Sequence, residues 1–335
     1  MSTASLPTEV GVVVIGRNEG RRLVACLSSL EGTLLPVIYV DSGSTDGSAQ
    51  AARAFCESVV ELDPSRPFSA GRARNEGWAA LRAAHPKTRF IQFLDGDCTL
   101  LNGWLAAAAE AMNAAPDVGI VVGELVERRP QASVYNRLCA LEWKSPAGEV
   151  RNFGALGGIM FVRADAFEQV GGFNETVIAG EDSELGLRIA QAGGRIMKVA
   201  APMATHDADM LRFSQWWRRA VRSGHAIAQR FNLHGNGPTR DSARERRSVL
   251  VWGVALPAAI LLLLPATRGA SALLVAGYAV LAWRIARHRL DRGDARADAW
   301  LYARYTVLGK FAEAIGMLKF HFNKMSGRYR IIEYK

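Results

Sequence analysis

Two acidic residues directly after a predicted strand could bind a divalent cation. Asp95-Gly96-Asp97 follows the apolar run over residues 89–94. Carboxylates one residue apart can share a cation, and the glycine between them lets the backbone come close to the ion. Oxygen ligands favour hard ions, so the pair predicts Mg²⁺ or Mn²⁺, bound together with substrate phosphates. The alternative is an ordinary Asp-Gly turn, and the position of the pair after an apolar strand favours the metal site.

Polar side chains elsewhere in the N-terminal part are suited to a nucleotide. Asp41 opens the loop DSGSTDGS after another apolar run, where its carboxylate can accept hydrogen bonds from a base or a ribose. Asn18 and Glu19 follow the first apolar run, and they too are either nucleotide-binding side chains or ordinary loop residues. Arg74 lies at a predicted helix start, where a guanidinium could meet a phosphate. The alternatives are a helix N-cap at Ser44 or Thr45 and a solvated helix start around Arg74.

Two further candidates for chemistry come later in the chain. The segment GEDSEL over residues 180–185 has three acids at a predicted helix start, where the helix dipole favours negative charge. The functional alternative is that an aspartate in this segment is a general base, which takes a proton from an incoming hydroxyl. His206 is a candidate third metal ligand, and the alternative is a structural histidine.

A basic and aromatic stretch follows residue 210. It contains Gln215, Trp217 and Arg218 with helical spacing. An aromatic ring beside guanidinium groups is suited to a sugar ring and a diphosphate. The alternative is a helix on a membrane surface, with tryptophan at the interface, and the two interpretations are compatible.

The elements that must position these residues follow from the hydrophobic pattern. Short β-branched runs predict strands, and they alternate with segments of helical spacing. The expected strands cover residues 11–15, 36–40, 89–94 and 119–122, and the expected helices cover 21–30, 74–84 and 105–114. This alternation predicts an α/β fold in which a mostly parallel sheet has helices on both faces. Ligands of such sheets bind beyond the carboxyl ends of the strands, where Asp41 and Asp95 stand.

Charge is unevenly distributed along the 335 residues, whose net charge is +9. Residues 1–210 carry 19 basic and 25 acidic side chains, whereas residues 211–335 carry 22 and 7. A basic C-terminal part indicates a polyanionic partner, either nucleic acid or a membrane surface. Residues 248–265 and 269–283 contain no charged side chain. They argue against nucleic acid and predict a membrane hairpin; the alternative is a buried helical pair of a soluble domain.

The hairpin allows a prediction of topology. Its segments of 18 and 15 residues are short for a bilayer core of about 30 Å, so two full spans and a re-entrant loop both stay open. Arginines on both flanks place these flanks in the cytoplasm, and the apolar spacing over residues 301–322 predicts an amphipathic interfacial helix. No signal peptide is visible and the four cysteines are scattered. We therefore expect a protein of the cell inner membrane with its catalytic domain on the cytoplasmic face.

The motifs in their order resemble family 2 glycosyltransferases, which are inverting enzymes with the Rossmann-like GT-A fold. The resemblance covers residues 10–225 and rests on VVVIGRNEG, VIYVDSGSTDGS, ARNEG, FLDGDC, GGIMFVRADAFEQVGGFNE, GEDSELGLRI and QWWRR. It implies transfer from a nucleoside-diphosphate sugar, with a UDP-sugar favoured, to a hydroxyl of a lipid-linked or other membrane acceptor. The alternatives are transfer to a polyprenyl phosphate, a nucleotidyltransferase, and a non-catalytic protein that docks on membranes and binds nucleotide or glycan.

The resemblance also assigns roles to residues. Asn18, Glu19 and Asp41 match positions that hold the nucleoside, and Asp97 is the better metal ligand of the D-x-D pair. Asp182 matches the catalytic base, with Glu181 as its neighbour. Gln215 and Arg218 match a Q-x-x-R-W motif of processive members, but Arg219 replaces its tryptophan, which argues against processivity.

The expected domains follow from these segments. They are a GT-A catalytic domain over 1–210, a basic and aromatic helix with a linker over 211–247, the membrane hairpin over 248–286, and a basic turn with an interfacial helix over 287–335.

Overall fold

A computed structural model describes residues 9–153 and 156–327 of the chain. The chain divides into two compact units. The first unit comprises residues up to Gln131 together with Glu142–Asp209, and the second comprises Ala132–Leu141 together with the chain from Met210 onward. Each unit has hydrophobic clusters of its own.

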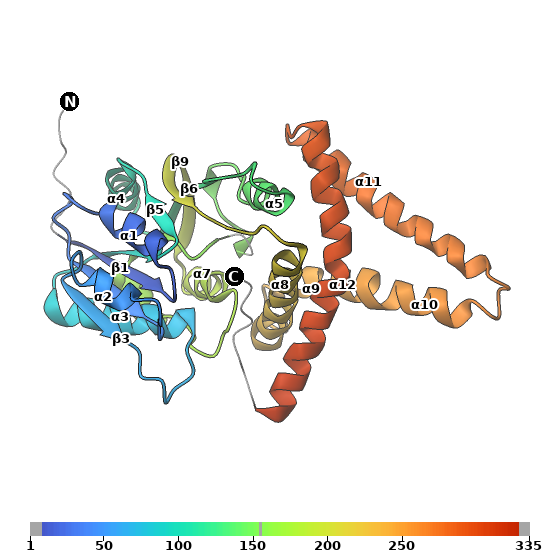
Figure 1. Ribbon diagram of the computed structural model, residues 1–335, viewed down its shortest axis with the longest axis horizontal. Helices are drawn as coiled ribbons and strands as arrows, with labels where there is room; N and C mark the ends of the chain where they lie inside the picture. Colours follow the sequence, from blue (N-terminus) through green and yellow to red (C-terminus); the bar gives the residue numbers. More distant parts are fainter. Residues whose placement is uncertain (1–8, 154–155, 328–335) are drawn as a thin grey trace. The chain divides into compact units, whose positions relative to one another are not determined.

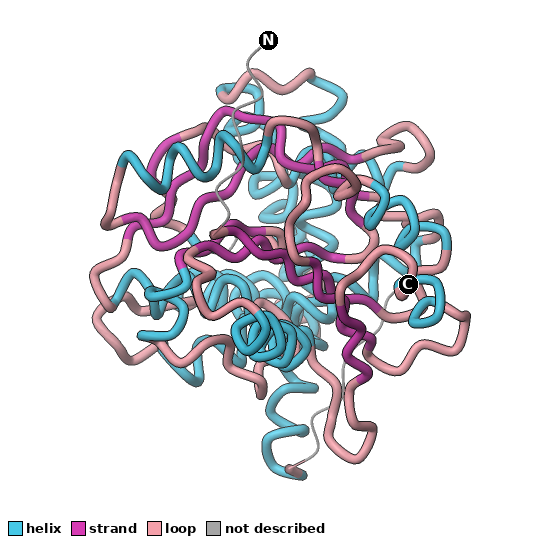
Figure 2. The backbone as a smooth tube through the Cα atoms, turned by 90° about the vertical axis from the view of Figure 1, so that its left-hand side faces the viewer, coloured by secondary structure: helices cyan, strands magenta, loops and turns pink. Residues whose placement is uncertain are grey.

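The first unit is built on one mixed sheet (Figures 1 and 2). Its strands are β1 (Val10–Gly16), β2 (Val37–Asp41), β3 (Ser58–Glu61), β4 (Phe90–Asp95), β5 (Cys98–Leu100), β6 (Val118–Glu127), β7 (Gly148–Glu149), β8 (Met160–Arg163) and β9 (Arg195–His206). They are ordered β3-β2-β1-β4-β8-β6-β9-β5 in the sheet, and β7 also pairs with β9. The strands β3, β2, β1 and β4 are parallel, as is the pair β6 and β9. The remaining pairs are antiparallel, so the expected parallel arrangement holds for only part of the sheet.

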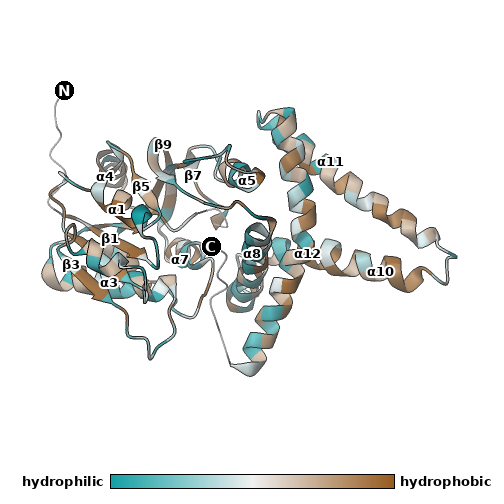
Figure 3. Cartoon of the chain, in the orientation of Figure 1, coloured by the Kyte–Doolittle hydropathy of each residue, from teal (hydrophilic) through white to brown (hydrophobic). Residues whose placement is uncertain are grey.

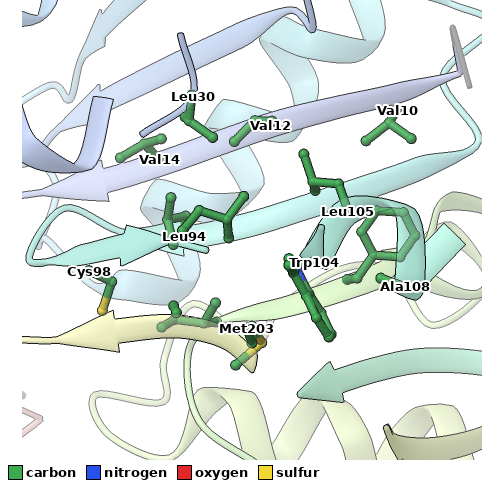
Figure 4. Packing of buried hydrophobic residues seen from close by; sticks show 14 of the residues in the cluster. Val10, Val12, Val14, Leu30, Leu94, Cys98, Trp104, Leu105, Ala108 and Met203 are labelled. Atoms are coloured by element: carbon green, nitrogen blue, oxygen red, sulfur yellow. The ribbon is translucent and has the colours of Figure 1, made fainter. Parts of the chain in front are cut away.

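Helices cover both faces of this sheet, as the alternation of apolar runs predicts. They are α1 (Arg21–Ser28), α2 (Ser48–Ala52), α3 (Ala70–Ala84), α4 (Trp104–Ala114), α6 (Ala164–Gln169) and α7 (Glu181–Gln191). Alternate residues of β1 enter different cores, because successive side chains of a strand point to opposite faces. Val12 and Val14 pack in a cluster with Trp104 of α4 (Figure 4), and Val13 packs in the other with Leu81 of α3.

The second unit is helical (Figure 1). Its elements are α5 (Val134–Glu142), α8 (Phe213–His234), α9 (Ala243–Val249), the π-helical segment η2 (Leu250–Ala255), α10 (Leu256–Leu263), the 3₁₀ segment η3 (Ala270–Val275), α11 (Ala276–Asp291) and α12 (Arg296–Ser326). Residues 243–249 form a helix, although residues 243–247 were expected to belong to the linker. This helix runs directly into the apolar segment, because no proline or glycine interrupts residues 243–252.

Two helices of this unit are long and apolar enough to cross a membrane, by length and composition alone (Figure 3). They are Ala243–Leu263, with 21 residues, and Ala270–Asp291, with 22 residues. Each would reach about 30 Å at about 1.5 Å per residue. Both exceed the lengths expected from the uncharged segments, because the arginine-bearing flanks continue the helices.

Small residues bring α12 close to its neighbours within the second unit. A Cβ atom at Gly316 would lie 2.0 Å from the Val221 carbonyl oxygen of α8, so the two backbones nearly touch. Two large apolar side chains at the C-terminal end of the expected stripe point away from these contacts. Leu318 and Phe322 are 67% and 68% exposed, whereas Ala312 of the same helix is fully buried. The stripe over residues 301–322 is therefore uncovered at its C-terminal end, whereas its Tyr305 and Phe311 pack against the rings of Trp216 and Tyr278.

Candidate active site

The Asp95-Gly96-Asp97 turn joins β4 to β5 at the carboxyl edge of the parallel strands. β1 and β4 pair in register, with Ile15 opposite Asp95, and the Gly96 amide donates to the Ile15 carbonyl at 2.8 Å. A Cβ atom at Gly96 would lie 3.2 Å from that same oxygen, and 3.4 Å from Cγ of Glu19. The glycine thus lets the turn pack against the end of β1. The side chain of Glu19 packs beside Gly96 of the same turn.

Asp97, Cys98 and His206 form a cluster of potential metal ligands. One ligand atom from each lies within 4.8 Å of the others. The antiparallel pairing of β5 with β9 creates the cluster, because Cys98 and His206 are directly opposite each other. Nε2 of His206 lies 3.4 Å from Oδ2 of Asp97, and the Cys98 thiol donates to Oδ1 of Asp97 at 3.3 Å. Burial raises the pKa of Cys98 well above its ordinary value, so without a cation the group is a neutral thiol.

Glu127, which the sequence did not single out, lies behind His206. Its Oε2 is 3.7 Å from Nδ1 of the histidine, and its side chain is fully buried. The carboxylate also accepts hydrogen bonds from the backbone amides of Arg129 and Ala208. The buried Nδ1 atom makes no hydrogen bond to the residues that the structure describes. A carboxylate behind an imidazole is the usual arrangement around a metal-bound histidine, so these residues fit a divalent cation.

Arg74 does not lie at an exposed helix start, where a contact with a phosphate was expected. Helix α3 begins at Ala70, one turn earlier than the sequence predicted, and Ser69 caps it by accepting from the Arg72 amide. Arg74 is therefore inside the helix and only 1% exposed. Its Nη2 donates to Oδ1 of Asp95 at 2.7 Å, and its Nη1 donates to Oε1 of Glu181 at 2.8 Å. Because both donors are engaged in the protein interior, Arg74 ties the D-x-D turn to the start of α7.

Other contacts hold this bridge in place. The Arg74 guanidinium lies 5.3 Å from the ring centre of Phe173, and a Cβ atom at Gly158 would lie 2.4 Å from its Nη2. Burial alone would lower the pKa of Arg74, but the carboxylates of Asp95, Glu181 and Asp182 raise it above its ordinary value. The guanidinium is thus a permanent cation among acidic groups.

The three acids of α7 occupy different environments. Gly180 precedes the helix with a left-handed φ of 74°, a conformation that favours glycine, and Glu181, Asp182 and Glu184 all lie in the first turn. Glu181 pairs with Arg74, and Glu184 pairs with Arg188 at 2.7 Å. Asp182 is partly buried and belongs to the same charged environment as Arg74. Glu181 thus links α7 to the D-x-D turn, and Asp182 follows it directly.

Asp41 and Asn18 organise two adjacent loops at the ends of β1 and β2. Asp41 is 2% exposed, and its Oδ1 accepts from the amides of Gly43 and Ser44. Its Oδ2 accepts from the Tyr39 hydroxyl at 3.0 Å. Asn18 accepts from the Thr45 amide at 2.8 Å. The loop remains non-helical up to α2, so the alternative of an N-cap at Ser44 or Thr45 is wrong.

Gln215, Trp217 and Arg218 lie on α8 in the second unit. Oε1 of Gln215 accepts from the amides of Leu211 and Arg212, so this side chain closes the first turn of the helix. Nε of Arg218 donates to the Ser214 carbonyl at 3.2 Å, and the ring of Trp217 lies 5.6 Å from that of Phe213. Their contact with a sugar or a diphosphate stays a prediction.

Comparisons with known proteins agree with this architecture. The model of glycosyl transferase family 2 matches residues 11–167, and that of glycosyl transferase family group 2 matches residues 90–286, more than half of the chain. The pre-mycofactocin glycosyltransferase of Mycobacterium tuberculosis is 31% identical over 230 residues, which cover 66% of this chain and 47% of the relative. The succinoglycan biosynthesis protein ExoA of Rhizobium meliloti is 31% identical over 211 residues, covering 58% and 62%. The chain thus spans about half to two thirds of the length of these relatives.

A solved structure shares the fold. The mannosyltransferase PcManGT from Pyrobaculum calidifontis, in complex with GDP-Man and Mn²⁺, superposes with a TM-score of 0.63 at 23% identity. The superposition covers 94% of this chain and 88% of that protein.

Proposed function

Because the chain belongs to glycosyltransferase family 2, we propose that it moves a sugar from a nucleoside-diphosphate sugar to a hydroxyl of a membrane-associated acceptor, with inversion at the anomeric carbon. The observation that carries the proposal is the buried bridge from Asp95 through Arg74 to Glu181. It connects the turn that carries Asp97 with the helix start that carries Asp182. A donor site and a general base are thereby held in one framework.

The nucleoside part of the donor is assigned to the loops after β1 and β2. Asn18, Glu19 and Asp41 lie there, at the carboxyl ends of parallel strands, where ligands of such sheets bind. Asp41 accepts from the amides of Gly43 and Ser44, so its part in nucleoside binding would be to hold this loop in place. A UDP-sugar is favoured by the resemblance, and PcManGT, which has the same fold, is described with GDP-Man.

Asp97 and His206 would hold Mg²⁺ or Mn²⁺, with Asp95 beside them and Glu127 orienting the histidine. The cation would neutralise the negative charge that grows on the departing diphosphate. Because Arg74 occupies one oxygen of Asp95, Asp97 is the stronger candidate ligand of the pair.

Asp182 is the proposed general base. Its carboxylate takes the proton of the acceptor hydroxyl while the hydroxyl oxygen bonds to the anomeric carbon and the bond to the diphosphate breaks. A single displacement of this kind inverts the configuration and needs no nucleophilic side chain. A polyprenyl phosphate acceptor would already be ionised and would need no base, so the acidic start of α7 favours a hydroxyl.

The acceptor is proposed to be a lipid-linked glycan at the cytoplasmic face of the inner membrane. The two long apolar helices of the second unit would provide the membrane segment over residues 248–286, between the catalytic domain and the C-terminal amphipathic helix. Arginines flank both ends of this segment, as the positive-inside rule requires for cytoplasmic flanks. The names of the relatives include succinoglycan biosynthesis, which concerns a polysaccharide.

A donor panel tests the proposal. The full chain in detergent is incubated with Mn²⁺, a membrane lipid extract and UDP-, GDP- or dTDP-sugars, and product mass and released nucleoside diphosphate are measured. We expect one sugar nucleotide to give a glycosylated lipid, with loss of turnover in EDTA and recovery on adding Mn²⁺ or Mg²⁺. The variant Asp97→Asn should be inactive, while Asp117→Asn, a matched change at an exposed surface acid, should keep its activity.

Two results would overturn parts of the proposal. Binding of nucleotide with no turnover for any donor would indicate the non-catalytic alternative. A product on polyprenyl phosphate that forms equally well with Asp182→Asn would replace the hydroxyl acceptor.

A further inference from the structure

We propose that Cys98 makes the cation site selective for a thiophilic ion: Asp97, Cys98 and His206 together bind Zn²⁺ in competition with Mg²⁺ or Mn²⁺. This inference rests on the metal site of the proposed function and deepens it. It concerns a ligand type, sulfur, that a site of two carboxylates would lack.

The strand pairing brings the thiol to the site. Cys98 is the first residue of β5, and its partner across the ladder in β9 is His206. The thiol is already hydrogen-bonded to Oδ1 of Asp97 at 3.3 Å, so one ion could touch both residues without a change of the backbone. All three ligand atoms lie within 4.8 Å of one another. Zinc–ligand bonds of about 2.0–2.3 Å fit inside a triangle of this size.

The chemistry of the three ligands suits zinc better than magnesium. Sulfur, imidazole nitrogen and a carboxylate oxygen are the three ligand types that Zn²⁺ takes in proteins, whereas Mg²⁺ prefers oxygen alone. Three protein ligands with a further position for water or substrate are typical of zinc sites that stay open. Oε2 of Glu127 lies 3.7 Å from Nδ1 of His206, beyond hydrogen-bond distance but on the side of the ring where a carboxylate stands at many zinc centres.

Zinc binding exchanges one bond for another at sulfur. The S–H bond breaks, a Zn–S bond forms, and the proton passes to solvent, with no change of oxidation state. Zn²⁺ would then occupy the ligands that Mn²⁺ needs. Zinc should displace manganese from the wild-type site, and removal of the sulfur should weaken this displacement selectively.

Cobalt spectroscopy tests the sulfur ligand directly. The full chain, stripped of metal and kept in detergent, is titrated with Co²⁺, which gives a sulfur-to-cobalt charge-transfer band in the near ultraviolet only when a thiolate is bound. We expect the band in the wild-type protein and its loss in Cys98→Ser. The matched control is Cys26→Ser, because Cys26 is equally buried in the same cluster but lies outside the metal-ligand triad. That control should keep the band.

Manganese release gives a second measurement. Zn²⁺ is added to the Mn²⁺-loaded protein, and free Mn²⁺ is followed by electron paramagnetic resonance. Loss of a partner behind a metal ligand costs about 10- to 100-fold in affinity, so loss of the sulfur ligand itself should raise the Zn²⁺ needed by about 100-fold or more. Should Cys98→Ser fail to fold, the chemical shift of bound ¹¹³Cd in the wild-type protein reports sulfur ligation without any variant.

Some results would overturn the inference. These are a wild-type protein with no charge-transfer band and no sulfur-shifted cadmium signal, or a band that survives in Cys98→Ser and vanishes in Cys26→Ser. The test is independent of turnover. A chain that shows the band but processes no sugar nucleotide would refute the proposed function and retain the zinc site.

Discussion

Removal of the Arg74 side chain tests how the site is held together. In Arg74→Met two carboxylates lose their shared partner, but the free-energy cost differs between them. The side chain of Glu181 is 8% exposed, whereas that of Asp95 is 34% exposed. Leaving one member of a buried pair without its partner costs about 3–5 kcal/mol, and an exposed pair contributes about 0–1 kcal/mol. Nearly all the loss should therefore come from Glu181.

The loss should appear as a lower melting temperature of the first unit. At about 2–4 °C per kcal/mol for a unit of this size, Arg74→Met should melt about 6–20 °C below the wild-type protein. Circular dichroism gives the melt, and hydrogen exchange of peptides from α7 assigns it to this unit. Adding Glu181→Gln to Arg74→Met should restore most of the lost stability, because a neutral amide is cheaper to bury than a carboxylate. Adding Asp95→Asn should restore little.

A melting temperature of Arg74→Met within about 2 °C of the wild-type value, a loss of under about 1 kcal/mol, would refute the cost assigned to Glu181. A rescue by Asp95→Asn as large as the rescue by Glu181→Gln would refute it as well. The conservative change Arg74→Lys should be intermediate, because an ammonium keeps the charge but cannot reproduce the two-armed contact of the guanidinium.

Four further predictions follow from the geometry. Asp182→Asn should lower kcat by about 10²–10⁴-fold with little change in nucleotide affinity measured by calorimetry, and near-normal turnover would leave Asp182 only a helix-start residue. Glu127→Gln should weaken Mn²⁺ binding about 10- to 100-fold in an electron paramagnetic resonance titration, and unchanged binding would contradict the proposal that Glu127 orients His206. Gly316→Ala should lower the melting temperature of the second unit, because the new Cβ atom would lie 2.0 Å from a backbone oxygen of α8. The control Gly309→Ala, whose new Cβ atom would lie 3.9 Å from its nearest neighbour, should be tolerated, and equal melting temperatures of the two variants would contradict the close helix crossing. Burial, together with nearby Lys319, lowers the pKa of His225 to about 4, so between about pH 4 and 6.5 the unfolded state binds a proton that the folded state does not. The free energy of unfolding should therefore fall as pH drops from about 6.5 towards 4, by up to about 1.4 kcal/mol per pH unit. Urea titrations should show this slope in the wild-type protein and not in His225→Gln, and a flat wild-type profile would refute the assignment.

Local patterns predicted much of the fold. The runs that became β1 and β2 are short, β-branched and apolar, and the run that became β4 is short and mostly apolar; such runs form strands buried on both faces. Asp41 and Asp95 stood at strand ends in the sequence, and they lie at strand ends in the structure. Strand β8 was not predicted, and because it runs antiparallel to β4, part of the sheet is mixed.

The contacts of the site depend on residues far apart in the sequence. Arg74 and Glu181 are 107 positions apart, and only the packing of α3 against α7 brings them together. An arginine at a predicted helix start carries no local sign that it is buried. Glu127 likewise lies in ELVERR, a stretch without a recognisable motif, and its position behind His206 follows from the register of β6 with β9. Spacing alone cannot give such a register.

The arrangement of α12 has a consequence for how this chain can change over time. Gly316 and Ala312 face the neighbouring helices together with the buried Met317 and Phe320, while Leu318 and Phe322 face outward. At Gly316 even one added methyl group should therefore be rejected, whereas larger changes that shrink or reshape the outward Leu318 should be accepted as long as the surroundings stay apolar. Related chains should vary at the outward bulky positions of this helix and keep Gly316, so that a ranking of positions by size alone would mistake some variable residues for constrained ones.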